Sequence, residues 1–222
     1  MSTPLNTRML EPETLLSAYC RGLFPMADSR TGVVRWYSAE RRGILPIDRF
    51  HIPRRLRKTI RQEPFRISAD SAFAKVMLGC AMPRSEDSDT WISDEIIEAY
   101  TRLHELGWAH SVEAWREDEL VGGIYGVSIH AAFFGESMFC RPDRGGDGAS
   151  KIALASLVGH LRRRGYRLFD AQFWNPHLDQ FGCEEVSRPL YSRRLKEALE
   201  RTDVTWGDFD PAAAATAALE AG

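Results

Sequence analysis

The run Ala132-Phe133-Phe134-Gly135-Glu136-Ser137-Met138-Phe139 lies in the middle of the chain and carries its clearest strand pattern. It predicts an apolar-rich strand, and two similar runs precede it at 109–116 and 120–128. Because only the turn Glu117-Asp118-Glu119 separates the first two runs, we predict that all three strands form an antiparallel meander. The polar, glycine-rich loop 141–148 then leads from the third strand into a long helix.

Helical spacing of apolar residues marks the segments on both sides of this meander. The apolar residues within 96–103 predict one face of a helix that begins after Ser93 and ends at Gly107. A second helix is predicted over 150–164, closed by Gly165. The remaining elements are predicted as a strand at 166–173, a short helix at 176–181, a strand at 183–186 and a helix at 189–201. The alanine-rich end from Pro211 is expected to fray.

Prolines break the N-terminal part into short elements, which predicts a small, irregular domain. A helix is expected from Pro12 to Gly22, followed by short strands at 33–37 and 44–47. Pro53 suits the first turn of a helix that carries five cations and no acidic residue: Arg54, Arg55, Arg57, Lys58 and Arg61. We divide the chain into a small N-terminal α/β domain (1–63), a larger domain with a mainly antiparallel sheet (64–201) and a C-terminal tail (202–222), an α+β protein.

Composition excludes several classes of protein. The chain has 222 residues, 44% hydrophobic and 27% charged, which is typical of globular proteins and excludes a disordered or coiled-coil chain. The net charge is −2, so any polyanion must bind a local patch. The longest stretch without formal charge, 120–135, is shorter than a membrane span, and Met1 to Leu10 holds no signal-peptide run. We expect a cytoplasmic protein that does not engage a membrane.

Sequence motifs for metal and nucleotide chemistry are absent. Cys20, Cys80, Cys140 and Cys183 are 43 to 60 residues apart, which is too far for a zinc knuckle or a redox motif and favours reduced thiols. The sequence contains no His-Glu-x-x-His helix, no Gly-Lys-Ser/Thr phosphate loop and no dinucleotide glycine fingerprint. We therefore predict that the protein needs neither a metal nor a cofactor.

The order of elements resembles the acyltransferase fold of the Gcn5-related acetyltransferases. An acetyl-coenzyme-A-dependent N-acetyltransferase is therefore one candidate. Such enzymes bind pyrophosphate with backbone N–H groups in an Arg/Gln-x-x-Gly-x-Gly/Ala turn before the helix. Here Arg144 is followed three residues later by Asp147, whose carboxylate would repel a phosphate. This candidate therefore takes second place.

Eight separate segments resemble the leucyl/phenylalanyl-tRNA-protein transferases. They are Ala18 to Pro25, Thr90 to Ile92, Ala99 to His104, Ala109 to Trp115, Leu120 to Val127, Gly135 to Phe139, Ala149 to Leu154 and Phe169 to Gln172. The Gly-Glu-Ser-Met-Phe block is highly specific. The resemblance implies a small N-terminal domain packed on an acetyltransferase-like C-terminal domain that binds aminoacyl-tRNA in place of coenzyme A.

The same resemblance implies an aminoacyltransferase. It would move leucine or phenylalanine, and methionine less well, from aminoacyl-tRNA to the N-terminal Arg or Lys of acceptor proteins, and so mark them for degradation by the N-degron pathway. A monomer is expected. Two places depart from the family pattern: Cys140 to Gly148 is several residues longer than the usual link, with Gly148 in place of an asparagine, and Met26 stands where many members have an aromatic residue.

Asp170 and Gln172 are the predicted catalytic residues. They lie two apart on a predicted strand and are expected to point to one face. The resemblance places the pair beside the reacting carbonyl, with Asp170 accepting from the attacking amine, directly or through Gln172. An aminoacyl ester is already activated, so positioning, proton removal and oxyanion stabilisation are sufficient. Whether Asp170 acts as a base or as an orienting charge is left open.

The substrate-binding residues follow from the resemblance too. Glu136 is implied to contact the donor's α-amino group or the adenosine, Trp91 to stack on the terminal adenine, and Asn175 to add a polar contact. Four residues are implied to line an apolar pocket for the donor side chain: Met138, Ile124, Leu154 and Phe169. The plainer alternatives are a solvated carboxylate for Glu136, a structural tryptophan and ordinary core residues.

The basic helix predicts a site for tRNA phosphates. We expect the contacts to come from Arg54, Arg57, Lys58 and Arg61. The alternative is a merely solvated face. A noncatalytic tRNA-binding module, with tRNA affinity but no transfer, is a further alternative.

Overall fold

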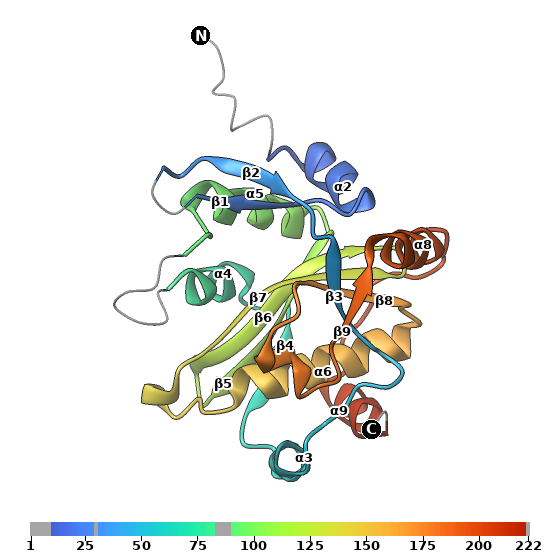
Figure 1. The fold of residues 1–222 in the computed structure, drawn as a ribbon. Coiled ribbons are helices and arrows are strands. Elements are labelled where there is room, and N and C mark those ends of the chain that lie inside the picture. The colour runs from blue at the N-terminus through green and yellow to red at the C-terminus, as the bar shows by residue number, and fades with distance from the viewer. Residues whose placement is uncertain (1–9, 29–30, 83–89, 221–222) are drawn as a thin grey trace.

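A seven-stranded sheet forms the centre of the computed structural model, which describes residues 10–28, 31–82 and 90–220. Strand β6 (Glu119–Ile129) pairs antiparallel with β5 (Ala109–Arg116) and with β7 (Ala132–Cys140), so the predicted meander is confirmed. The strand order is β4-β5-β6-β7-β8-β3-β9 (Figure 1). The four remaining strands are β3 (Arg41–Leu45), β4 (Arg66–Ala69), β8 (Leu168–Gln172) and β9 (Glu184–Ser187).

Helices cover both faces of this sheet. A Cβ placed at Gly122 of β6 would lie 2.6 Å from the Ala149 Cβ of α6 (Ala149–Arg164), and one placed at Gly123 would lie 3.0 Å from Val76 of α4 (Phe73–Ala81). Successive strand residues point to opposite faces, so α6 lies on one face and α4 on the other. Helix α5 (Asp94–Glu105) packs beside α4, and its predicted start at Ser93 is confirmed as the N-cap.

The N-terminal part contains α2 (Pro12–Cys20) and a two-stranded sheet of β1 (Phe24–Ala27) and β2 (Val34–Tyr37). The chain then contributes β3 to the large sheet, where it lies between β8 and β9 and pairs antiparallel with both. The predicted domain boundary at residue 63 stays a prediction. Strand β3, which lies before this boundary in the sequence, is part of the large sheet. The α+β fold with a mainly antiparallel sheet is confirmed.

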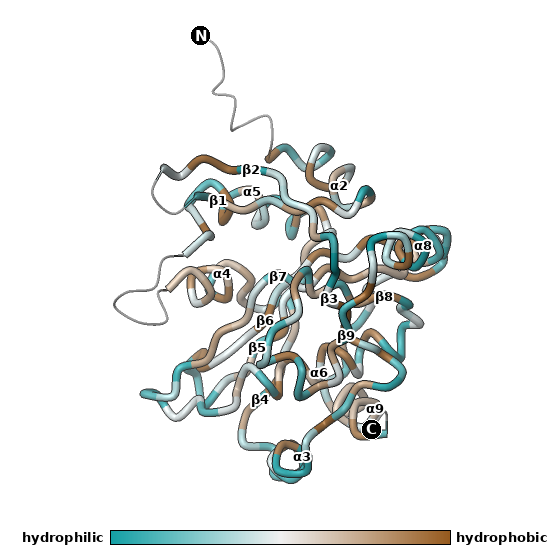
Figure 2. The backbone as a smooth tube through the Cα atoms, viewed as in Figure 1, coloured by the Kyte–Doolittle hydropathy of each residue, from teal (hydrophilic) through white to brown (hydrophobic). Residues whose placement is uncertain are grey.

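The outer helices match their predicted positions closely. They are α3 (Arg54–Arg61), α7 (Pro176–Asp179) and α8 (Arg188–Leu199), and the glycine-rich loop holds one short 3₁₀ turn at Pro142–Arg144. Figure 2 shows hydrophilic residues gathered on α3 and α8 and hydrophobic residues along α4. None of the described helices is long and apolar enough to cross a membrane. Residues 1–9, the greater part of the stretch tested for a signal peptide, lie outside the described residues.

The alanine-rich end differs from the expectation. It forms a helix, α9 (Pro211–Glu220), that packs against α6 and buries Ala214 and Ala218. A Cβ at Gly159 of α6 would lie only 1.9 Å from the Ala214 carbonyl oxygen, so the two helices approach closely through small residues. The expected fraying is therefore wrong for residues 211–220, because small side chains here provide a packing surface.

Strands β7 and β8 separate after a short paired region. They run parallel and pair only where Ala132–Phe134 lies beside Leu168–Asp170. At its end β8 leaves regular geometry, since Gln172 has a φ of +57° and the register with β3 shifts between Gly43 and Ile44. The second half of β7 is therefore left without β8 beside it.

Candidate active site

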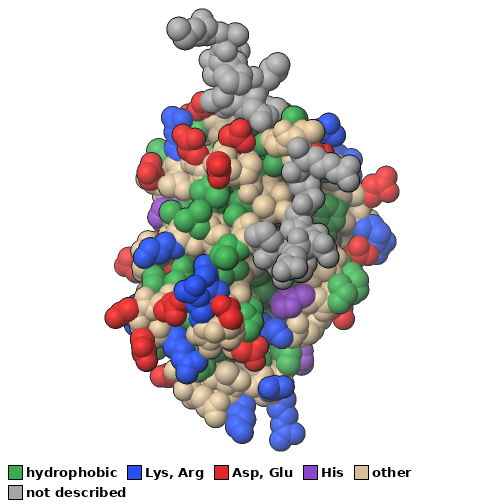
Figure 3. Space-filling model, turned by 90° about the vertical axis from the view of Figure 1, so that its left-hand side faces the viewer, with side chains coloured by type: hydrophobic (Ala, Val, Ile, Leu, Met, Phe, Trp, Pro, Cys, Tyr) green, Lys and Arg blue, Asp and Glu red, His purple; other side chains and the backbone are tan. Residues whose placement is uncertain are grey.

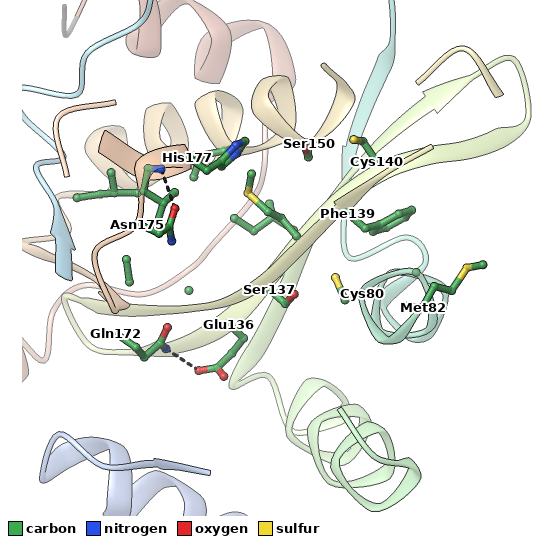
Figure 4. A pocket seen from close by; sticks show the side chains of 18 of the residues that line it. Cys80, Met82, Glu136, Ser137, Phe139, Cys140, Ser150, Gln172, Asn175 and His177 are labelled. Atoms are coloured by element: carbon green, nitrogen blue, oxygen red, sulfur yellow. Dashed lines mark hydrogen bonds between the residues drawn. The ribbon is translucent and has the colours of Figure 1, made fainter. Parts of the chain in front are cut away.

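A cavity of about 680 Å³ opens where β7 and β8 separate. This volume lies within the range of small-molecule sites. Its walls come from β6, β7 and β8, the end of α4, the start of α6 and the segment around α7. Figure 4 shows Glu136 and Gln172 at one end of the cavity and Phe139 and Cys140 toward the other.

The structure brings together most of the residues predicted for catalysis and substrate binding. Those that line the cavity are Trp91, Ile124, Glu136, Met138, Leu154, Phe169, Gln172 and Asn175. Asp170 does not line it. Residues from five separate segments of the chain therefore form one continuous surface.

One part of this surface, which we call the apolar chamber, consists of Ile124, Met138, Leu154 and Phe169. Ile124 and Met138 are direct partners in the β6–β7 register, so their side chains lie next to each other. Leu154 comes from α6 and Phe169 from β8. A Cβ at Gly135 would lie 2.4 Å from the Phe169 ring, so only glycine there leaves room for this aromatic wall.

Glu136 stands at the polar end, surrounded by neutral donors. Its Oε1 accepts hydrogen bonds from the Tyr19 hydroxyl at 2.7 Å and from Gln172 Nε2 at 3.1 Å. The Tyr100 hydroxyl lies 3.5 Å from Oε2 and is also hydrogen-bonded to the Tyr19 hydroxyl. Burial, followed by the charge of Glu136, raises the pKa of both tyrosines well above the ordinary value, so they stay protonated.

The surroundings of Glu136 favour its protonated form. Burial is the largest cause and raises the pKa of this carboxyl to about 8, helped by the nearby Asp170 carboxylate. The hydrogen bonds from Tyr19 and Tyr100 and the charge of Arg42 act in the opposite direction. A carboxyl group in this range can take up and release a proton near neutral pH.

Asp170 lies deeper and is saturated with donors. Arg42 donates to both of its oxygens, from Nε at 2.8 Å and from Nη2 at 2.7 Å, and neither residue is more than 1% exposed. The Tyr191 hydroxyl and the Gln172 backbone N–H add bonds of 2.6 and 2.9 Å. The Arg42 guanidinium also lies over the rings of Phe24 and Tyr191.

The shared face expected for Asp170 and Gln172 is not observed. Gln172 reaches the cavity and Glu136, whereas Asp170 turns to Arg42 and Tyr191. Strand alternation fails here because Gln172 has a left-handed backbone conformation at the irregular end of β8. The two residues are still linked, because the Gln172 N–H donates to the Asp170 carboxylate.

Four residues of this cluster were not predicted: Tyr19, Arg42, Tyr100 and Tyr191. Tyr19 and Tyr100 belong to segments that carry the family resemblance, and each lies on the buried face of its helix. Arg42 carried a weaker signal, a charged residue separated by Gly43 alone from the apolar run 44–47. No local pattern distinguishes Tyr191 from an ordinary core tyrosine.

Asn175 and Trp91 occupy the edges of the cavity. The Asn175 side-chain oxygen accepts from the Leu178 N–H at 3.0 Å and so caps α7, a bond that Figure 4 shows. This leaves its amide nitrogen as the group suited to a ligand. Trp91 is half-buried and packs against the core, which is compatible with both a structural and a stacking role.

The basic helix α3 lies at the lower end of the molecule in Figure 1, where Lys and Arg side chains project in Figure 3. Four of its cations are exposed: Arg54, Arg55, Lys58 and Arg61. Arg57 differs, because it is partly buried and its Nη1 donates to the Leu219 carbonyl at 2.7 Å. Arg57 therefore ties α3 to α9.

Acidic residues, histidines and cysteines do not gather into metal-binding groups of three or more within the described residues. All four cysteines are thiols rather than members of a disulfide, with Cys80 and Cys183 buried and Cys20 and Cys140 exposed. The side chains of the cavity offer carboxyl, amide, hydroxyl, thiol, guanidinium, imidazole and apolar groups.

Comparison with known proteins identifies the family. Residues 44–196 match the family described as leucyl/phenylalanyl-tRNA protein transferase, and residues 8–40 match its N-terminal domain. A curated relative from Hyphomonas neptunium is 52% identical over 190 residues, which are 85% of this chain and 72% of the relative. Another, from Paramagnetospirillum magneticum, is 47% identical over 213 residues, 96% of this chain and 99% of the relative. Both are named leucyl/phenylalanyl-tRNA–protein transferase.

A solved structure, the ribosomal-protein-alanine N-acetyltransferase from Brucella melitensis biovar Abortus 2308, is also similar. It has 16% sequence identity and a TM-score of 0.37, and the match covers 58% of this chain and 89% of that one. The family match decides between the candidates that the sequence left open, against the acetyl-coenzyme-A enzyme and the noncatalytic module. The chain belongs to the leucyl/phenylalanyl-tRNA protein transferases, enzymes that transfer an amino acid from aminoacyl-tRNA to a protein.

Proposed function

We propose that this protein moves leucine or phenylalanine, and methionine less well, from tRNA to the N-terminal arginine or lysine of acceptor proteins, and so marks them for degradation in the cytoplasm. One observation carries the proposal: the apolar chamber lies beside the hydrogen-bonded Glu136–Gln172 pair in a single cavity. A donor side chain in the chamber would bring its ester carbonyl to the polar pair.

The chamber suits the donors. Its walls are aliphatic and aromatic, and Met138 is an unbranched thioether that adapts to both a γ-branched and an aromatic side chain. The same flexibility discriminates poorly against methionine. A branch at the β-carbon would lie closer to the donor backbone, where the strand walls leave less room to adapt.

The reaction needs a neutral amine. Its nitrogen attacks the ester carbonyl, an amide bond forms, the ester C–O bond breaks, and the ribose hydroxyl of the tRNA leaves with a proton. In our proposal Glu136 accepts the proton released by the amine and returns it to the leaving oxygen. The attacking nitrogen loses this proton only after it has bonded to the carbonyl carbon, and a carboxyl group with a pKa of about 8 can both accept and release a proton near neutral pH.

Gln172 orients the amine in this scheme. Its Nε2 donates to Glu136, so its amide oxygen is the group that accepts a hydrogen bond from the incoming nitrogen. Asp170 acts as a positioning residue, because four donors already occupy its two oxygens and one of them is the Gln172 N–H. Of the two roles considered from the sequence, we therefore propose the orienting charge that acts through Gln172.

The exposed cations of α3 complete the proposal. Arg54, Lys58 and Arg61 are solvent-exposed and carry no acidic neighbour within the helix, which suits contact with tRNA phosphates. We assign Arg57, which was also predicted to bind tRNA, to the contact with α9 instead. The tRNA body would then be held mainly by charge, and the cavity would select the donor.

The direct test is transfer of labelled leucine from charged tRNA to a peptide that begins with arginine. We expect labelling of this peptide and of one that begins with lysine, and no labelling when the N-terminal amine is acetylated. A matched peptide that begins with glutamate serves as the specificity control. Equal labelling of the glutamate peptide, or none of any peptide, would contradict the proposed acceptor.

A further inference from the structure

An unusual run of residues lines the cavity along β7. Every residue from Gly135 to Cys140 contributes to its wall. Successive residues of a strand point to opposite faces, so a cavity on one face of the sheet would contact only alternate residues. The cavity therefore reaches around the edge of β7, and the backbone of this edge faces into it.

The sheet pairing of β7 explains why this edge is available. Over the described residues, β7 pairs with β6 along its whole length but with β8 only as far as Phe134. Beyond that point β8 turns toward β3 and ends at Gln172. Backbone N–H and C=O groups on such an edge form a ready template for another extended chain.

We propose that the N-terminal segment of the acceptor protein binds as an added strand along residues 135–140 of β7, parallel to it. The proposal rests on the proposed function in one respect, that the acceptor amine reacts at Glu136 and Gln172. The added strand takes the place that β8 leaves, and it continues the parallel pairing that β8 began.

The direction follows from the position of the reacting pair. Glu136 lies at the start of the open edge and Cys140 at its end, so a chain whose amine is at Glu136 runs in the same direction as β7 (Figure 4). The chain then leaves the cavity beside Arg141 and Asp143, which also line it. Six strand residues offer room for the first few residues of an extended acceptor.

The two sides of the edge have different tasks. On the α6 side the apolar chamber is filled by the donor side chain in our proposal. On the α4 side Phe139 packs over Gly79, and Cys80 and the exposed Met82 complete an adaptable wall. Alternate side chains of an added strand would face this wall, whereas its backbone bonds would not depend on sequence. This suits an enzyme whose acceptors share only their first residue.

A scan of N-methylated acceptor peptides tests the proposal. One amide at a time, from residue 2 to residue 4, is methylated in a peptide that begins with arginine, and kcat/KM is measured with leucyl-tRNA. In a parallel ladder, alternate residues direct their N–H to the neighbouring strand. We expect losses of about tenfold or more that alternate between large and small along the peptide. Equal losses at all positions, or none, would overturn the added strand.

The unmodified peptide separates the two hypotheses. If it is not labelled, the proposed acceptor fails and the added strand fails with it. If it is labelled and the scan shows no alternation, the added strand alone is wrong.

Hydrogen exchange gives a second readout that needs no turnover. Saturating acceptor peptide, in the absence of aminoacyl-tRNA, should slow amide exchange in 135–140. Strand β5, which is already paired on both sides, should not change. Unchanged exchange in 135–140 at a peptide concentration that saturates the enzyme would contradict the proposal.

Discussion

Asp170 and Glu136 belong to one cluster but have opposite surroundings. Asp170 is sealed by Arg42 and Tyr191 and takes its donors from charged and neutral groups together. Glu136 accepts its hydrogen bonds from neutral donors among the described residues, lies at the cavity wall and has a pKa raised to about 8. Two neighbouring carboxyl groups can thus have different roles, one holding geometry and the other exchanging a proton.

The largest effect is expected on stability, when the buried Asp170 loses its partner Arg42. Arg42→Met leaves the Asp170 carboxylate buried without its cation, and we expect the free energy of unfolding to fall by about 3–5 kcal/mol. Urea denaturation measures this loss. Arg41→Met is the matched control, because Arg41 pairs with Glu185 at the surface and its loss should cost about 0–1 kcal/mol. Equal, small losses of unfolding free energy in both variants would show that the buried Arg42–Asp170 pair does not stabilise the fold.

At the cavity wall, a substitution of Glu136 is expected to have a large effect on turnover. Glu136→Gln keeps the size and one oxygen that can accept from Tyr19 and Gln172, but it removes the proton acceptor, so the single-turnover rate at neutral pH should fall about a hundredfold. Quench measurements with prebound leucyl-tRNA follow this rate. A variant with the wild-type rate would remove Glu136 from the chemistry.

The same substitution should change stability in the opposite direction to Arg42→Met. The pKa of Glu136 is higher in the folded than in the unfolded chain, so the folded state binds more protons. Stability from this group is therefore fully present below about pH 4.3, the ordinary pKa of glutamate, and is lost as the pH rises through about 8. Glu136→Gln should raise the melting temperature at alkaline pH and not at acidic pH.

Helix α3 repeats the contrast between sealed and open groups. Log affinity for tRNA falls as log salt rises. Replacing the exposed Arg54, Lys58 and Arg61 by alanine should make this fall shallower by about three units, one for each lost phosphate contact. Arg57→Ala is the matched control, because its bond to the Leu219 carbonyl should affect stability and leave the slope unchanged. Equal slopes in the triple variant and the wild type would indicate that these cations of α3 are solvated and do not contact tRNA.

The smallest effect concerns the apolar chamber. Isoleucyl-tRNA should be a poorer donor than leucyl-tRNA by about tenfold, because its β-branch is crowded beside the donor backbone. Single-turnover rates with the two charged tRNAs measure the ratio. The ratio should shrink in Met138→Ala, which opens the chamber, and equal rates in the wild type would contradict this picture of the chamber.

Much of the fold follows from local patterns in the sequence. Apolar runs and helical spacing predicted the meander and helices α5 and α6, because these elements bury a regular face. The segments that carry the family resemblance identified the chamber residues and Glu136, and they converge on one cavity. The meander and the two helices were predictable because each buries a regular face that its own sequence pattern shows.

The rest depends on contacts between distant segments. Arg42 and Asp170 are 128 positions apart, and Tyr19 and Glu136 are 117 apart, so no local pattern indicates that they pair. The turn of Gln172 away from regular strand geometry accompanies a register shift against β3, an element expected in another domain. The alanine-rich sequence of α9 does not by itself predict where this helix packs. The packing depends on Gly159 of α6, which lets α9 approach closely.

One measurement tests the division of work between the two carboxyl groups most directly: the pH dependence of the ratio of single-turnover rates, wild type over Glu136→Gln. Ionisation of the acceptor amine affects both enzymes and cancels in this ratio. If Glu136 accepts the proton, the ratio rises with pH and levels off above about pH 8. A ratio that stays constant from about pH 6 to about pH 9 would show that a group other than Glu136 accepts the proton.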